Sequence, residues 1–256
     1  MIGTAGEDGK SDGTQAIRRA AAILRLIGQG HAQGASLAEV GGAMGLSRST
    51  AHRIMKCLVD EGLVKHDPLR KRYVIGRLVH ELGLTVTAET LEVARWGGAV
   101  ARVAARTGAT AYLMGRSGVE AVCLLKQEGT SVIRVIPVDI GQRRYLGVGA
   151  GATALLAALD PQTRENILAI IIPRLADFPG MSEEIIRDHI DAALREGLVV
   201  SRSKVVRDVI GIGMAIPDGD RAPWLSLSIA SLESQATPQM VAAWKDILRE
   251  EIAAGL

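Results

Sequence analysis

Residues 36–63, SLAEVGGAMGLSRSTAHRIMKCLVDEGL, decide how the first part of this chain folds. Ser36, followed three positions later by Glu39, has the capping-box pattern. In this pattern the serine oxygen and the glutamate carboxylate each accept a backbone N–H at the start of a helix. The pattern predicts a short helix over residues 37–44. Gly45 is expected to end that helix, because glycine readily adopts the left-handed conformation found after helices.

A second helix is predicted to begin after Ser47, another N-cap candidate, and to extend to about residue 61. Its apolar side chains recur at helical spacing on one face, at Ala51, Ile54, Met55 and Leu58. Hydrogen-bond donors have the same spacing on the opposite face, at Ser49, His52, Arg53 and Lys56. Two helices joined by a tight turn, with donors facing outward, form the helix-turn-helix pattern. Such donors can bind phosphates and the edges of bases.

An ordinary helical hairpin with a solvated basic face would show the same features. The residues that follow favour DNA binding. Residues 63–66 and 72–75 are predicted to form two strands around a turn at Asp67-Pro68-Leu69. The tip of this hairpin carries Arg70, Lys71 and Arg72. A recognition helix followed by a basic hairpin is a winged helix, whose wing lies on the phosphate backbone.

Length and charge distribution indicate two domains. A chain of 256 residues can form two domains, each with its own core. The net charge of +2 hides an asymmetry, because residues 1–85 contain twelve Lys or Arg and eight Asp or Glu, and the remainder contains eighteen and twenty. A basic first part and a slightly acidic second part fit a nucleic-acid-binding domain joined to a domain of another kind.

Cysteine usage and hydropathy favour a cytoplasmic protein. Cys57 and Cys123 lie in apolar patterns without paired or metal-binding spacing, so both are expected to be reduced core residues. We find no signal peptide and no span of about 20 apolar residues, so we expect no membrane segment. The five histidines show no metal spacing, and no nucleophile motif is present. The sequence therefore predicts no active site, no metal and no cofactor.

Four segments are predicted along the chain. Residues 1–13 are mostly small and polar and are expected to be disordered. Residues 14–76 form the winged helix-turn-helix domain, whose first helix covers about residues 14–29. Residues 77–88 are predicted to be a linker helix, whose apolar side either pairs with a second copy or packs on its own domain. Residues 89–256 form a second domain that begins with a helix; the family resemblance given below implies that it is an effector-binding and oligomerisation domain.

The second domain is predicted to have an α+β fold, an antiparallel sheet with flanking helices. Strand patterns lie at residues 111–116, 120–126, 131–138, 198–203, 209–216 and 224–231. Helix patterns lie at residues 89–107, 152–159, 162–171, 182–196 and 238–253. Ser117-Gly118 separates the first two strands as a hairpin turn. Strands in hairpins, with helices grouped between them, form an antiparallel rather than a parallel sheet.

The segment from Gly147 to Gly151 precedes a predicted helix. Ala152 stands where a dinucleotide-binding fingerprint requires its third glycine, and no βαβ unit surrounds the segment, so we exclude that fold. Two interpretations stay open. Bare backbone N–H groups at a helix N-terminus can bind a small anion such as a carboxylate. Alternatively, the small residues pack closely against the sheet.

The last predicted strand has one face of small residues, Ser226, Ser228 and Ala230. This face is too small and too polar for a good apolar core, so it is expected to border a cavity. A solvated face is the alternative.

Segments in both parts of the chain resemble the IclR family of bacterial transcriptional regulators. They are RRAAAILRLIGQG, the stretch SLAEV–DEGLV with the wing, GATAYLMGRSGVEAVCLLKQEG, GQRRYLGVGAGATALLAAL and GIGMAIPDGDRAPWLSLSIAS. The resemblance covers residues 14–254. It implies a winged helix-turn-helix, a helical linker and a GAF-like effector domain. It also implies a homodimer or homotetramer that binds operator DNA and controls catabolic genes in response to a small organic or aromatic acid.

The resemblance also carries over site residues by position. Together with the outward helix face and the wing, the predicted DNA-binding residues are Ser47, Arg48, Ser49, Thr50, His52, Arg53, Lys56, Arg70, Lys71 and Arg72. The predicted effector-binding residues are Gly149, Ala150, Ser201, Gly211, Ser228 and Ala230. Lys204 and Asp208 stand where the family often has an acidic residue and a glycine, which leaves the local loop and the charge of the ligand open.

Two other classes of function stay open at this point. One is an enzyme whose α+β domain is catalytic, and the other is a regulator whose second domain only oligomerises. Adding metabolites to the purified protein separates the three by turnover, binding without turnover, or neither.

Overall fold

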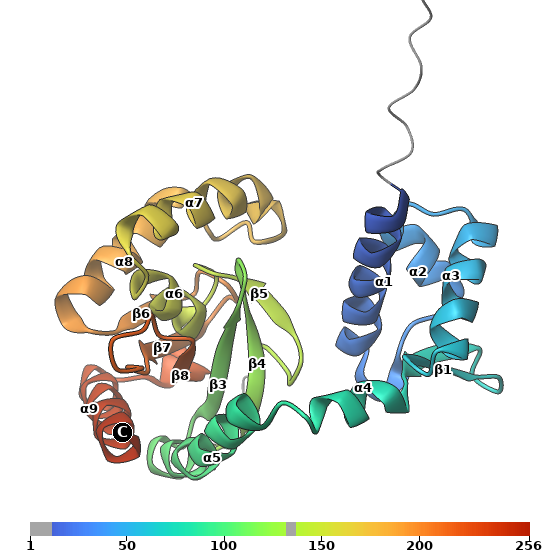
Figure 1. The fold of residues 1–256 in the computed structure, drawn as a ribbon. Helices are drawn as coiled ribbons and strands as arrows, with labels where there is room; N and C mark the ends of the chain where they lie inside the picture. Colours follow the sequence, from blue (N-terminus) through green and yellow to red (C-terminus); the bar gives the residue numbers. More distant parts are fainter. Residues whose placement is uncertain (1–11, 132–136) are drawn as a thin grey trace, which may run out of the picture. The chain divides into compact units, whose positions relative to one another are not determined.

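A computed structural model describes residues 12–131 and 137–256 (Figure 1). The chain divides into two compact units, Met1–Thr87 and Ala88–Leu256. Most of the tail expected over residues 1–13 lies outside the described residues, and the first helix begins at Asp12, two residues earlier than expected.

The predicted DNA-binding part of the first unit is built from three of its described helices and a two-stranded hairpin. They are α1 (Asp12–Gln29), α2 (Leu37–Met44), α3 (Arg48–Asp60), β1 (Val64–Asp67) and β2 (Arg72–Ile75). Ile23 and Ile27 of α1 pack against Val40 of α2 and Met55 of α3 in one buried cluster. The hairpin is tied to this core, because Ala35 and Tyr73 exchange backbone hydrogen bonds of 2.9 and 2.8 Å.

The predicted capping box and glycine end of α2 and the predicted cap of α3 are confirmed. The N–H of Ser36 donates to Glu39 Oε2 at 2.7 Å, and the N–H of Glu39 donates to Ser36 Oγ at 3.2 Å. Gly45 ends α2 with a φ of 59°, in the left-handed region. Ser47 caps α3 by accepting the N–H of Thr50.

The linker differs from the expected helix over residues 77–88. The helix α4 (Arg77–Gly83) ends early, and α5 begins only at Thr87. Between them, the N–H of Thr85 donates to Leu82 O and the N–H of Val86 donates to Gly83 O, so the chain makes tighter turns there. Glycine is a poor helix former and β-branched residues are stiff, so Gly83, Thr85 and Val86 favour the interruption.

The second unit is built on one antiparallel sheet with the strand order β5-β4-β3-β8-β7-β6. Its strands are β3 (Thr110–Ser117), β4 (Glu120–Gln127), β5 (Arg143–Tyr145), β6 (Val199–Arg202), β7 (Val209–Ala215) and β8 (Leu225–Leu232). The α+β fold expected from the sequence is therefore present. The strand expected over residues 131–138 lies mostly outside the described residues. The strand that pairs with the outer side of β4 is β5, which the sequence analysis did not predict.

Helices cover both faces of this sheet (Figure 1). On one side are α5 (Thr87–Thr107) and α9 (Pro238–Gly255), whose Trp96 and Leu248 share a buried cluster with Leu113 and Leu227 of the sheet. On the other side are α6 (Ala150–Ala157), α7 (Pro161–Ile171) and α8 (Glu183–Glu196). The described residues also form 3-10 turns at His31–Gln33, Ile172–Asp177 and Glu233–Gln235.

The small-residue face of β8 receives the start of α6. Ser226, Ser228 and Ala230 are all buried, so the solvated alternative for this face is wrong. The hydroxyl of Ser226 donates to Gly151 O at 2.9 Å. A Cβ on Gly213 of β7 would lie 2.5 Å from Ala150 C and from Gly151 N. The helix can approach this closely only because the facing residues are small.

Candidate functional sites

The N-terminal end of α3 presents a cluster of hydroxyl groups. Ser47 Oγ lies 3.1 Å from Ser49 Oγ and donates to Thr50 Oγ1 at 2.9 Å. Ser47 also accepts the N–H of Thr50 at 3.3 Å. Ser47 therefore has a capping role, while Ser49 beside it is exposed.

The outward face of α3 carries exposed cations. Arg48, His52, Arg53 and Lys56 are exposed, whereas Ala51, Met55 and Leu58 on the opposite face are buried. Within the described part of the chain, neither Arg48 nor Arg53 nor Lys56 has a carboxylate within ion-pair distance. These cations are therefore available for an external anion.

Cys57 lies on α3 as well, and its position corrects an expectation. The side chain is exposed rather than part of the core, whereas Cys123 is buried and burial raises the pKa of its thiol. Both are free thiols. Cys57 follows the exposed Lys56 and precedes the buried Leu58, so it lies at the border of the apolar face of α3.

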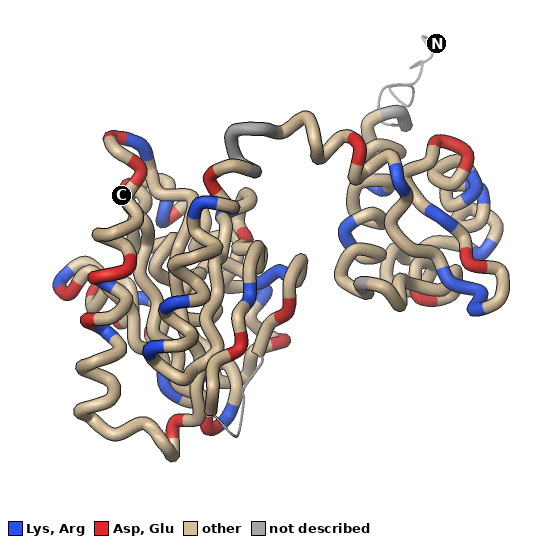
Figure 2. The backbone as a smooth tube through the Cα atoms, turned by 90° about the horizontal axis from the view of Figure 1, so that it is seen from below, with Lys and Arg blue, Asp and Glu red and all other residues tan. Residues whose placement is uncertain are grey.

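The wing places two of its three cations at the tip. Asp67 Oδ1 accepts the N–H groups of Leu69 and Arg70 at 3.0 and 3.1 Å, which shapes the turn. Arg70 and Lys71 are exposed, and Lys71 has a φ of 53°. Figure 2 marks where Lys and Arg positions fall along the backbone of this unit.

Arg72, the third wing cation, turns back toward the helices. Its Nη2 donates to Glu39 Oε2 and to Gly34 O, both at 3.0 Å, and its Nε donates to Gln33 O at 2.6 Å. The contacts of Arg72 favour a structural role rather than the DNA contact predicted for it.

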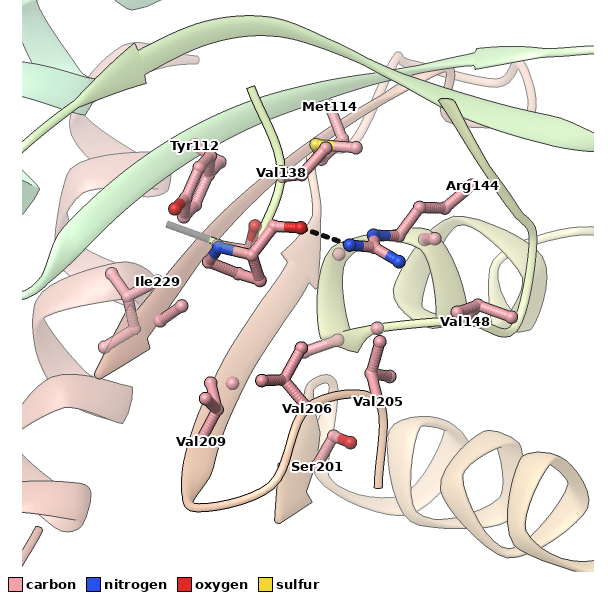
Figure 3. Close-up of a pocket in the computed structure, with 18 residues that line it drawn as sticks. Tyr112, Met114, Val138, Arg144, Val148, Ser201, Val205, Val206, Val209 and Ile229 are labelled. Atoms are coloured by element: carbon pink, nitrogen blue, oxygen red, sulfur yellow. Dashed lines mark hydrogen bonds between the residues drawn. The ribbon is translucent and has the colours of Figure 1, made fainter. Parts of the chain in front are cut away.

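A pocket opens in the second unit between the sheet and the start of α6 (Figure 3). It encloses about 600 Å³ of empty space, counting the part that is open to solvent. All six residues predicted to bind an effector line it: Gly149, Ala150, Ser201, Gly211, Ser228 and Ala230. Residues far apart in the sequence are thus brought together by α6, β6, β7 and β8.

Most other walls of the pocket are apolar, and the sequence analysis missed them. They include Met114, Val138, Val148, Val205, Val206 and Val209. Two polar residues were also missed, Tyr112 and Arg144. A signal for Tyr112 and Met114 exists, because the pleat of β3 places them on one face and they pair with Ser228 and Ser226. Burial raises the pKa of the Tyr112 hydroxyl.

Arg144 has no comparable sequence signal. It is half-buried, its Nη2 donates to Pro137 O, and its guanidinium carbon lies 5.6 Å from the centre of the Phe178 ring. Burial lowers the pKa of Arg144. Its place in the pocket depends on β5, which is a strand of only 3 residues.

The loop from Ser203 to Asp208 forms one rim of the pocket. Both of these residues have a positive φ, 48° and 57°. Asp208 adopts the left-handed conformation that glycine would favour at this position. Its carboxylate accepts the N–H and the hydroxyl of Ser234, each at 3.0 Å. Neither Lys204 nor Asp208 is among the described residues that line the pocket.

Other kinds of site find no support in the described residues. Across residues 12–131 and 137–256, no group of three His, Cys, Asp or Glu side chains converges to hold a metal. Among the helices that the structure describes, none is long and apolar enough to cross a membrane.

Comparisons with known proteins connect these two sites with regulators of transcription. Residues 16–68 match the IclR helix-turn-helix domain, and residues 87–254 match the bacterial transcriptional regulator IclR C-terminal domain. The chain is 26% identical over 250 residues to the glycerol operon regulatory protein of Streptomyces coelicolor, covering 92% of this chain and 94% of that protein.

Solved structures show the same fold. A putative IclR transcriptional regulator from a Silicibacter species is 21% identical, with a TM-score of 0.80 and 94% of each chain covered. An IclR homolog from Microbacterium hydrocarbonoxydans, complexed with 4-hydroxybenzoate, is 20% identical, with a TM-score of 0.72; 94% of this chain and 97% of that chain are covered.

Proposed function

Because the chain belongs to the IclR family of bacterial transcriptional regulators, we propose that α3 binds the major groove of an operator and that the pocket binds a small effector. At the level of the family, the protein is a transcriptional regulator with a DNA-binding helix-turn-helix and an effector domain, and not an enzyme. The DNA contacts of α3 and the wing, the chemistry of the ligand and the assembly state are our proposals.

The observation that carries the DNA-binding proposal is the set of exposed cations on α3 that form no ion pair with a described carboxylate. A recognition helix contacts bases with its outward side chains, and arginine can donate two hydrogen bonds to one guanine. We assign base contacts to Arg48, Ser49, Thr50, His52, Arg53 and Lys56. Arg70 and Lys71 contact the backbone phosphates. We assign structural roles to Ser47 and Arg72. Ser47 caps α3 and Arg72 pairs with Glu39, so their polar groups are already hydrogen-bonded within the protein.

The operator can be found by selecting bound duplexes from a random pool with the purified protein. Arg53→Ala should then lose about 1–3 kcal/mol of operator affinity, with a smaller loss for random DNA. Arg25→Ala removes the same charge from an exposed position on α1 and serves as the control. An unchanged ratio of operator to random affinity in Arg53→Ala would show that this register of the helix is wrong.

The effector proposal is supported by the pocket. Its walls are mostly apolar with a few polar groups, which is the composition typical of small-molecule sites. We propose a small organic or aromatic acid, bound among Gly149, Ala150, Ser201, Gly211, Ser228 and Ala230. The ligand of the Microbacterium relative makes 4-hydroxybenzoate a suitable first compound to test.

We further propose a homodimer or homotetramer, with a GAF-like second unit, acting in the cytoplasm where operator DNA is found. Leu82, Leu84, Val86 and Leu91 are large apolar side chains left exposed along α4, α5 and the turn between them. Symmetric assemblies bind paired half-sites in helix-turn-helix regulators. Light scattering measures the assembly mass directly, and a monomer at micromolar concentration would contradict this part of the proposal.

A further inference from the structure

Two neighbouring arginines on β5 have opposite environments. Arg143 is neutralised, because its Nε donates to Glu120 Oε2 at 2.8 Å and its Nη2 donates to Ser117 Oγ at 2.8 Å. Arg144 lines the pocket instead, and its guanidinium points toward the interior (Figure 3). In the part of the chain that the structure describes, its hydrogen-bond partner is a carbonyl and no carboxylate pairs with it.

A half-buried guanidinium without a carboxylate partner lowers the stability of the folded protein. A half-buried charge loses hydration, and one carbonyl and one ring restore only part of it. Arginine cannot escape by losing its proton, since it stays charged in proteins. Residues that lower stability without a structural return are typical of functional sites.

The described lining holds no counterion for this charge. Among the residues in 12–131 and 137–256 that line the pocket, there is no Asp and no Glu. The same space is bordered by the N-terminal end of α6, where a helix favours negative charge. Five valines are among the other lining residues that the structure describes, and they favour an apolar body. Arg144 is the one cation among these described lining residues, so it provides for one carboxylate.

We propose that Arg144 is the specificity-determining residue of this pocket and that it selects a monocarboxylate with a small apolar or aromatic body. The inference rests on the proposed effector function and deepens it. The ligand's carboxylate accepts paired hydrogen bonds from the guanidinium and neutralises its charge. The body of the ligand lies against Val138, Val206 and Val209. A neutral amide of the same shape leaves the charge without a counterion.

The test uses the full-length protein and four named acids: benzoate, 4-hydroxybenzoate, phenylacetate and butyrate, each paired with its primary amide. Thermal shift identifies the acids that bind, and calorimetry gives their Kd. The wild type should bind at least one acid about ten- to a hundredfold more tightly than its amide. Arg144→Met should lose that preference.

Arg207→Met is the matched control. Arg207 lies on the same rim loop as Val206, is exposed, and does not line the pocket. The variant therefore removes the same charge nearby and should keep the preference for the acid. Circular dichroism establishes that each variant is folded. If Arg144→Met does not fold, Arg144→Lys replaces it; this variant keeps the charge but loses the paired geometry, so the preference should be reduced but not abolished.

Three results would overturn the inference: equal binding of acid and amide, an undiminished preference in a folded Arg144→Met, or no binding by any of the four acids. The proposed function is judged separately. Acids and amides that bind equally, and that both fail to bind Ser228→Leu, would leave the pocket as an effector site without a role for Arg144. Failure of the wild type to select any duplex would instead overturn the DNA-binding proposal.

Discussion

Arg72 on the wing and Glu39 on α2 are joined by a hydrogen bond of 3.0 Å between Nη2 and Oε2. The same carboxylate oxygen accepts the N–H of Ser36 at 2.7 Å. One side chain therefore closes the capping box of α2 and holds the base of the wing. This carboxylate therefore acts together with the Ala35–Tyr73 backbone hydrogen bonds in holding the wing against the helix-turn-helix.

This arrangement predicts a pH dependence. The N–H of Ser36 and then the charge of Arg72 lower the pKa of Glu39 below its ordinary value of 4.5. A carboxyl group whose folded-state pKa is lowered stabilises the fold above its unfolded-state pKa, and this stabilisation is lost as the pH falls through the folded-state value. Hydrogen exchange of the α2 and β2 amides should therefore accelerate in the wild type as the pH falls below 4.5, after correction for intrinsic rates.

The variant Glu39→Gln should show fast exchange already at neutral pH and a weaker pH dependence. Glu61→Gln, which removes a carboxylate at the exposed end of α3, serves as the control. A pH profile in Glu39→Gln that matches the wild type would contradict the role of this carboxylate.

The wing tip gives a prediction about salt. Lys71 has a left-handed backbone, so Lys71→Asn removes the charge while keeping a residue that tolerates this conformation. Binding to operator and to random duplex should weaken by a similar factor, because a phosphate contact carries no sequence information. The slope of log K against log salt concentration should fall by about one. A loss confined to the operator would assign Lys71 to base contact instead.

Larger side chains on β8 should fill the effector pocket. Ser228→Leu extends an apolar side chain into the space between β8 and α6, so effector binding should be lost in calorimetry. Operator affinity without effector should stay near that of the wild type, because the DNA-binding residues belong to the other unit. Ala230→Val fills the same pocket with a smaller change and should weaken effector binding in the same direction. Wild-type effector affinity in both variants would remove this strand face from the site.

Two glycines on β7 should respond differently to the same substitution. A Cβ on Gly213 would lie 2.5 Å from backbone atoms of Ala150 and Gly151, whereas a Cβ on Gly211 would lie 3.3 Å from the Ala150 side chain. Overpacking of this kind typically costs about 1–3 kcal/mol, and backbone relieves it less easily than a side chain does. Gly213→Ala should therefore lower the midpoint of urea unfolding more than Gly211→Ala. Equal midpoints would show that α6 moves freely away from the sheet.

The sequence by itself determined the local features of this protein. The capping box of Ser36 and Glu39, the cap at Ser47 and the turn at Gly45 each depend on residues within one or two helical turns. The two faces of α3 and of β8 follow from periodicity, which is set by backbone geometry. The six predicted effector residues were carried over from the resemblance to the IclR family, and all of them line one pocket.

The tertiary structure decided what depends on distant neighbours. Arg72 belongs to a basic tip in the sequence, but a carboxylate 33 residues away draws it inward. The interruption after Gly83 depends on weak local preferences that a continuous apolar pattern conceals. Arg144 lies in the pocket because the short strand β5 pairs with β4, and such a strand has too few residues to show a period. The charge of the pocket is therefore invisible in the sequence, because it arises from a side chain that only the folded sheet directs inward.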